Sequence, residues 1–146
     1  MTSIHRSALL PYSQQQLYDL VNDVEAYPSY MDGCVGAQVL EAGESRMLAR
    51  LDLARGGISQ SFTTLNILSP CERIHLTLCE GPFETFDGTW RFNALAPGAC
   101  KVSLDLEFAV RGSLLGAAAA RLFDGVTGNL VAAVVRRAEA IYGCSR

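Results

Sequence analysis

The 146-residue sequence has little charge and few of the residues that most often carry out chemistry. Charged residues make up 18% of the chain, two histidines occur, and none of the five cysteines forms a C-x-x-C motif. The sequence also lacks a glycine-rich phosphate loop, a zinc-ligand spacing, a nucleophile elbow and an apolar run long enough to cross a bilayer. These absences argue against a nucleotide-binding enzyme, a zinc protein, a serine hydrolase and a membrane-spanning protein.

The charge balance also counts against one class of partner. A net charge of −3 and an isoelectric point of about 5.3 argue against nonspecific nucleic-acid binding, and we expect no DNA partner. Because the first six residues lack the apolar core of a secretory signal, we expect a cytoplasmic protein. No disulfide framework is expected, and the cysteines are predicted to be buried free thiols: Cys34, Cys71, Cys79, Cys100 and Cys144.

Short alternating segments separated by turn residues fill the middle of the chain. With 49% hydrophobic residues, the sequence predicts one domain over residues 1–146 with a sizeable core. Turn residues recur at intervals too short for crossover helices, so the strands should form an antiparallel sheet. The expected strands span residues 4–10, 35–40, 47–54, 59–68, 72–79, 84–93 and 101–110.

Two helical regions accompany these strands. Ser13 begins an S-Q-Q-Q stretch with capping-box spacing, and Pro28 is expected to end or bend the helix that follows. Residues 113–142 are predicted to form one long helix with an apolar stripe. Gly125 and Gly128 have low helix propensity and predict a kink or a close contact there. A twisted sheet followed by a long helix can close around a cavity.

Candidate catalytic groups are few, and each has a simpler structural explanation. His75 alternates with apolar neighbours and should face away from their side of the sheet. Glu80, Glu84 and Asp87 surround a turn and are expected in solvent, although paired carboxylates can do acid–base work. Arg137 falls within the apolar stripe of the last helix, so its guanidinium either extends to solvent or points into a cavity mouth. We therefore expect no catalysis and no metal site.

Aromatic side chains suit either a core or the wall of an apolar cavity. The same residues are consistent with both arrangements. The residues predicted to line a cavity come from the segment after the first helix, from the sheet and from the last helix: Tyr27, Tyr30, Phe62, Phe83, Phe86, Trp90, Phe92, Leu122, Val126, Leu130 and Arg137.

Several motifs together resemble one family over nearly the whole chain. They are LPYS at residues 10–13, VNDVEAYP at 21–28, GC at 33–34, GPF at 81–83, a glycine at 88 with WRF at 90–92, and RA at 137–138. In this combination the chain resembles the ribosome-association toxin (RatA) and coenzyme-Q-binding START-like family. That family is a branch of the polyketide cyclase/Bet v 1-like helix-grip superfamily.

The resemblance implies an α+β helix-grip fold: a curved antiparallel sheet of about seven strands around a long C-terminal helix, with short helices after the first strand. It also implies two activities. Mitochondrial relatives bind coenzyme Q or similar lipids, and bacterial relatives are described as toxins that bind the 50S ribosomal subunit and block 70S formation. Two residues depart from the family pattern: Asp32 replaces a usual proline, and Glu84 replaces a common basic residue, which weakens an rRNA contact at that turn.

These observations predict a non-catalytic protein that binds a hydrophobic ligand between the sheet and the last helix. The ligand would be an isoprenoid quinone such as ubiquinone, or a lipid, and the protein would support respiratory electron transport. No cofactor is required, and a transient contact with a membrane surface would accompany the role. The alternative is a toxin that binds the 50S subunit and inhibits translation.

Overall fold

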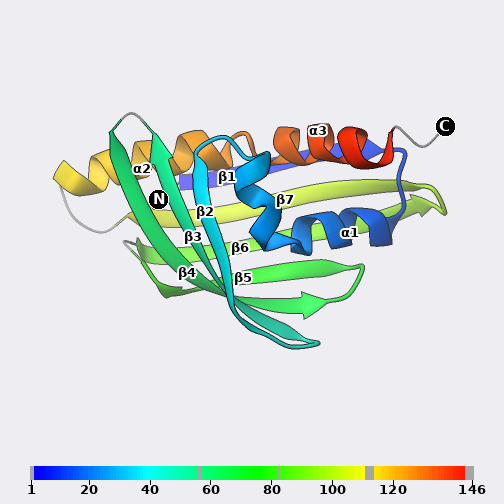
Figure 1. Cartoon of the computed structure of the whole chain (residues 1–146), viewed down its shortest axis with the longest axis horizontal. Helices are drawn as coiled ribbons and strands as arrows, with labels where there is room; N and C mark the ends of the chain where they lie inside the picture. Colours follow the sequence, from blue (N-terminus) through cyan, green and yellow to red (C-terminus); the bar gives the residue numbers. More distant parts are fainter. Residues whose placement is uncertain (1, 56, 82, 111–113, 144–146) are drawn as a thin grey trace.

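The computed structural model describes residues 2–55, 57–81, 83–110 and 114–143. Within them the chain forms a seven-stranded antiparallel sheet with helices packed against it (Figure 1). The strand order is β1-β7-β6-β5-β4-β3-β2, which confirms the predicted antiparallel arrangement. The strands are β1 (Thr2–Leu10), β2 (Cys34–Ala42), β3 (Arg46–Arg55), β4 (Ile58–Ser69), β5 (Arg73–Glu80), β6 (Phe83–Ala96) and β7 (Ala99–Val110).

The helices lie at two points in the sequence, one group after β1 and one after β7. They are α1 (Gln14–Asn22), the 3₁₀ helix η1 (Val24–Ser29), α2 (Leu114–Thr127) and α3 (Leu130–Tyr142). The predicted capping box begins α1: the Ser13 hydroxyl accepts from the backbone N–H of Gln16 at 3.1 Å, and the Ser13 N–H donates to the Gln16 side chain at 2.9 Å. The box bonds two backbone N–H groups that lack a partner within the helix.

The prediction of one continuous helix over residues 113–142 is wrong, because the chain breaks between α2 and α3 at Gly128 and Asn129. The break lies beside the glycines whose low helix propensity predicted a kink or a close contact, and that part of the prediction is confirmed. The side-chain amide of Asn129 donates to the carbonyl of Gly125 at 3.1 Å. In a continuous helix that carbonyl would accept from the backbone N–H of Asn129, so the side chain replaces the helical bond and α2 ends. Ser113, the expected first residue of the helix, lies outside the described residues.

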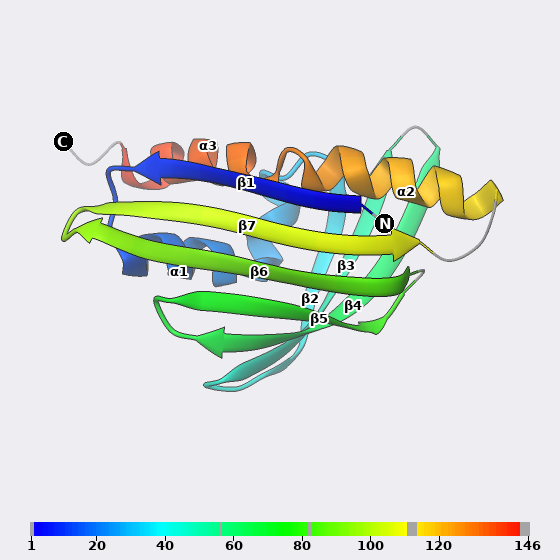
Figure 2. The ribbon, with the colours of Figure 1, turned by 180° about the vertical axis from the view of Figure 1, so that it is seen from behind.

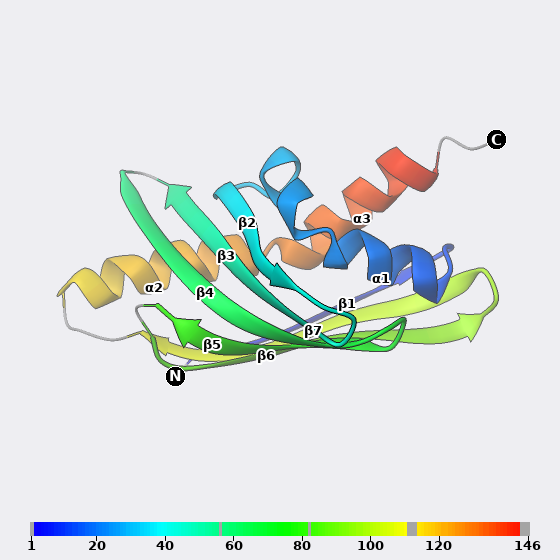
Figure 3. The ribbon, with the colours of Figure 1, turned by 60° about the horizontal axis from the view of Figure 1, so that its bottom comes forward.

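Bulges bend the sheet around the C-terminal helices. Register shifts interrupt the pairing of β2 with β3, of β4 with β5 and of β6 with β7. An extra residue on one strand bends that strand and increases its twist. As a result, β2, β3 and β4 turn away from β6 and β7, and α2 and α3 run across the sheet (Figure 3).

One face of the sheet forms the core. On β7, Val102, Leu104, Leu106 and Phe108 are at most 2% exposed, which confirms the predicted alternation on this strand. The helices cover this face from two sides. Helix α2 contacts β3, β4 and β7, while α3 contacts β1, β7 and α1; Figure 2 shows α3 running alongside β1.

Phe123 fixes α2 to the sheet. Its ring centroid lies 4.6 Å from that of Phe108, 4.8 Å from that of Phe83 and 5.4 Å from that of Phe62. Such edge-on ring contacts add to the free energy of apolar burial. The position of α2 over the strands therefore depends on this aromatic cluster.

Candidate functional site

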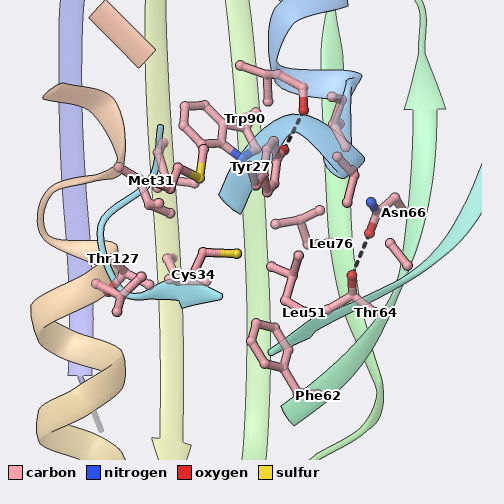
Figure 4. Close-up of a pocket in the computed structure, with 18 of the residues that line it drawn as sticks. Tyr27, Met31, Cys34, Leu51, Phe62, Thr64, Asn66, Leu76, Trp90 and Thr127 are labelled. Carbon is pink, nitrogen blue, oxygen red and sulfur yellow. Dashed lines mark hydrogen bonds between the residues drawn. The ribbon is translucent and has the colours of Figure 1, made fainter. Parts of the chain in front are cut away.

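A cavity of about 70 Å³ lies between the inner face of the sheet, α1 with η1, and the end of α2 (Figure 4). One water molecule needs roughly 10–15 Å³ measured in this way, so the space holds several waters or a small ligand. Most of the described lining side chains are apolar, and none of them is charged. The interior therefore suits an uncharged, largely apolar molecule.

The structure brings six of the eleven predicted cavity residues to the lining. They are Tyr27, Phe62, Phe86, Trp90, Val126 and Leu130. Three others, Phe83, Phe92 and Leu122, are buried in the core beside the cavity. Tyr30 and Arg137 pack on each other away from the lining, with the Arg137 Cζ 5.1 Å from the centre of the Tyr30 ring. Ligand contact by any of these residues stays a prediction.

Four polar lining residues were absent from the sequence-based set: Asn22, Thr64, Asn66 and Thr127. The signal for two of them was present in β4. Thr64 and Asn66 alternate with Phe62 along the strand, and the period of two places all three on one face. Their polarity on a buried face was the sign that this wall differs from an ordinary core.

Thr64 and Asn66 form a buried pair on the wall made by β4. They are 6% and 4% exposed, and the Thr64 hydroxyl donates to the Asn66 amide oxygen at 2.7 Å (Figure 4). The Asn66 side-chain nitrogen has no acceptor among the described residues. The side-chain oxygen of Asn22, at the end of α1, is also buried, and no described residue donates to it. An unpaired buried polar group costs free energy, so each is a point where a ligand or water would bond.

Burial raises the pKa of two tyrosines: Tyr27, within η1, and Tyr30, the residue directly after η1. The Tyr27 hydroxyl donates to the carbonyl of Val21, and burial raises the pKa of Tyr27 well above its usual value. Burial also raises the pKa of Tyr30, although the charge of Arg137 acts in the opposite direction. Both phenols are neutral near pH 7.

The predicted acid–base candidates lie outside the cavity. His75 faces the outer side of the sheet, as predicted, where its imidazole lies 2.7 Å from the Asp87 carboxylate. Glu80, Glu84 and Asp87 are exposed. Among the described residues no group of three or more His, Cys, Asp or Glu side chains is placed to hold a metal ion.

The thiols differ in exposure, which corrects the expectation that all five are buried. Cys34 and Cys100 are buried, Cys71 is intermediate and Cys79 is exposed on the outer side of β5. Burial raises the pKa of Cys34 and of Cys100, which keeps both thiols protonated and unreactive near neutral pH. Cys144 lies outside the described residues.

A family profile described as polyketide cyclase / dehydrase and lipid transport matches residues 10–135. The chain belongs to this family. It is also 46% identical over 142 residues to the ribosome association toxin RatA of Pseudomonas aeruginosa, covering 97% of this chain and 99% of that relative. The family membership and the likeness to RatA confirm the resemblance identified in the sequence.

Two more distant similarities complete the comparison. The mitochondrial coenzyme Q-binding protein COQ10 homolog B of Xenopus laevis is 26% identical over 141 residues, which cover 94% of this chain and 58% of that protein. The crystal structure of the Zhui aromatase/cyclase from Streptomyces superposes with a TM-score of 0.84 at 15% identity, covering 99% of both chains. The latter likeness establishes the helix-grip fold alone. No described helix combines the length and apolar character needed to cross a bilayer.

Proposed function

We propose that this protein binds the 50S ribosomal subunit in the cytoplasm and blocks formation of the 70S ribosome. The observation that carries the proposal is the 46% identity to a ribosome association toxin over nearly the full length of both chains. The 26% identity to a coenzyme Q-binding protein is much weaker. The sequence alone had favoured binding of a hydrophobic ligand over ribosome binding. We therefore reverse that order and put ribosome binding first.

An arginine pair on the outer face of the sheet supports an anionic partner. Arg73 on β5 lies directly opposite Arg91 on β6. Arg91 is paired with Asp105 at 2.8 Å, whereas Arg73 has no ion pair among the described residues. Like charges directly opposite each other in a sheet cost stability, and phosphate groups of rRNA would offset that cost.

The turn before β6 offers no such contact. Glu84 is exposed at the beginning of β6, where a carboxylate repels phosphate. Contact with rRNA is therefore better placed at Arg73 than at this turn. The acidic net charge of −3 also means that binding must depend on a local contact and not on the overall field.

Ribosome profiles test the proposal. Overproduction of the protein should lower the 70S peak in sucrose gradients, raise the free subunit peaks and place the protein in the 50S fractions. Arg73→Gln should weaken this co-sedimentation several-fold, because loss of one phosphate contact weakens binding. Arg136→Gln, the same charge change on an exposed position of α3, is the matched control. Unchanged 70S levels with the protein at the top of the gradient would exclude the activity.

Carriage of a hydrophobic ligand such as a quinone or lipid is the second candidate function. The cavity with its uncharged lining favours it. Its volume of about 70 Å³ is below the roughly 300–1,000 Å³ of typical ligand sites, so a full-sized quinone requires the lining to widen. Organic extraction of protein purified from cells, followed by mass spectrometry, should find a stoichiometric neutral lipid or quinone. An empty extract, with no rise in Tm on addition of quinone, would exclude carriage.

A further inference from the structure

The cavity is not uniformly apolar: its polar groups lie in an otherwise hydrophobic wall. Thr64 and Asn66 project from the buried face of β4, which otherwise presents Phe62 and Leu68. Most of the described lining is aliphatic or aromatic. Buried polar groups are normally paired, so the unpaired ones define where a bound molecule would make its hydrogen bonds.

Two of the lining residues, Asn66 and Asn22, carry polar atoms of opposite character that have no protein partner among the described residues. The Thr64 hydroxyl donates to the Asn66 amide oxygen at 2.7 Å. The amide nitrogen of Asn66 is then a donor with no acceptor among the described residues. The Asn22 side-chain oxygen is a buried acceptor with no donor in the part of the chain that the structure describes. A carbonyl group matches the first and a hydroxyl group matches the second, while a primary amide offers a partner to either.

Charge excludes other classes of ligand. None of the described lining residues is a lysine, arginine or histidine, so a buried carboxylate or phosphate would have no counter-charge. Arg137 does not supply one, because its guanidinium packs over the Tyr30 ring. Arg55 does not either, since it pairs with Asp32 at 2.9 Å outside the lining.

We propose that the cavity selects a neutral molecule that is apolar except at one end, where an amide, carbonyl or hydroxyl group bonds to Asn66 or to Asn22. Ligands headed by a carboxylate or a phosphate are rejected. The inference rests on the second candidate function, ligand carriage, and is independent of ribosome binding. It narrows the class of lipid from any hydrophobic molecule to uncharged ones with a hydrogen-bonding end.

A pair of ligands that differ only in charge tests the selection. Hexanamide and hexanoate share their carbon skeleton, and near neutral pH only hexanoate is ionised. Titration of the purified full chain, followed by shifts of backbone amide signals in NMR spectra, gives the affinity of each. Hexanamide should bind at least about tenfold more tightly than hexanoate, because the buried anion loses its hydration without gaining a counter-charge.

The Thr64→Val/Asn66→Leu double variant tests the site itself. It replaces both members of the pair with apolar groups of similar size, a change that is close to neutral for folding. Hexanamide affinity should fall about tenfold, the loss expected for one buried hydrogen bond. Thr63→Val, on the opposite face of β4, is the matched control and should bind hexanamide normally, and the Tm of each variant checks its fold.

The outcomes separate the inference from ligand carriage in general. Equal affinity for hexanamide and hexanoate would overturn the proposed selection and leave carriage standing. Normal hexanamide binding by a folded double variant would overturn the role of Thr64 and Asn66. If neither compound shifts the lining signals, water satisfies the unpaired groups and the inference is wrong; whether the protein carries a larger ligand is decided separately by the extraction.

Discussion

Tyr27 and Tyr30 are neighbouring tyrosines whose hydroxyl groups have opposite situations. Their rings meet edge-on with centroids 6.0 Å apart. The Tyr27 hydroxyl donates to the carbonyl of Val21, whereas the Tyr30 hydroxyl is buried and has no partner within the described ranges. The Tyr30 ring still has a clear role, because Arg137 packs over it. Comparing the two tyrosines therefore separates what a buried ring contributes to the free energy of unfolding from what a buried hydroxyl contributes.

Replacing each tyrosine with phenylalanine should change stability in opposite directions. Tyr30→Phe keeps the ring and removes an unpaired polar group, so the free energy of unfolding should rise by up to about 1 kcal/mol. Tyr27→Phe removes the hydrogen bond to the Val21 carbonyl and leaves that carbonyl without this donor. The free energy of unfolding should therefore fall by about 1–3 kcal/mol. Urea unfolding near pH 7 measures both. Equal destabilisation by the two changes would show that the Tyr30 hydroxyl has a partner in solution.

The same phenols predict a loss of stability in alkali. Burial raises the pKa of both in the folded protein, while an unfolded tyrosine titrates near pH 10. Above about pH 10 the unfolded state therefore releases protons that the folded state keeps, and stability falls as the pH rises. Tyr30→Phe should reduce the fall measured by urea unfolding between about pH 9 and pH 11. An unchanged slope in this variant would argue against burial of the phenol.

At the scale of elements, the turn before β2 packs against the last turn of α2 through a glycine. Gly33 has a positive φ of 91°, and a Cβ atom there would lie 2.5 Å from Cγ2 of Val126. Gly57 provides a comparison, because its φ is 82° and a Cβ there would meet nothing described within 4 Å. Both positions need the left-handed backbone, and only Gly33 also needs the space that α2 occupies.

Alanine at these two positions should separate backbone strain from helix docking. Gly57→Ala should cost about 1 kcal/mol for the left-handed conformation. Gly33→Ala should cost roughly 2–4 kcal/mol, because the methyl group also displaces Val126 and with it α2. Thermal or urea unfolding gives both values. Costs that agree within error would mean that α2 does not press on the turn.

For the whole molecule, local pattern predicted most of the fold and little of the site. The alternation on β7 and the capping box at Ser13 depend on neighbouring residues, so one sequence was enough to find them. The low propensity of Gly125 and Gly128 indicated a kink in the last helix, but the end of α2 at Asn129 depends on which donor bonds to the Gly125 carbonyl, and propensity does not decide that. The contact of Arg137 with Tyr30 joins segments 107 positions apart and appears only after folding. Asn66 could not be identified as a site residue from the sequence, because only the folded structure shows that its face of β4 borders a cavity.

The two proposed activities use different parts of the molecule, and this predicts that they can be lost separately. The cavity lies against the inner face of the sheet, whereas Arg73 is exposed on the outer face. The Thr64→Val/Asn66→Leu variant should therefore lose hexanamide binding and still co-sediment with 50S subunits. Arg73→Gln should do the reverse. Parallel titrations and gradients on the same two proteins measure this.

If each variant loses one activity and keeps the other, the ligand and the ribosome bind independent surfaces. Loss of 50S binding in a folded double variant would contradict independence and mean that the state of the cavity controls the outer surface. Such coupling has a physical route, because β4 carries Thr64 and Asn66 on its inner face and pairs with β5, which carries Arg73. A change in the curvature of β4 on ligand binding would then reach Arg73 through the strand pairing at Ser69.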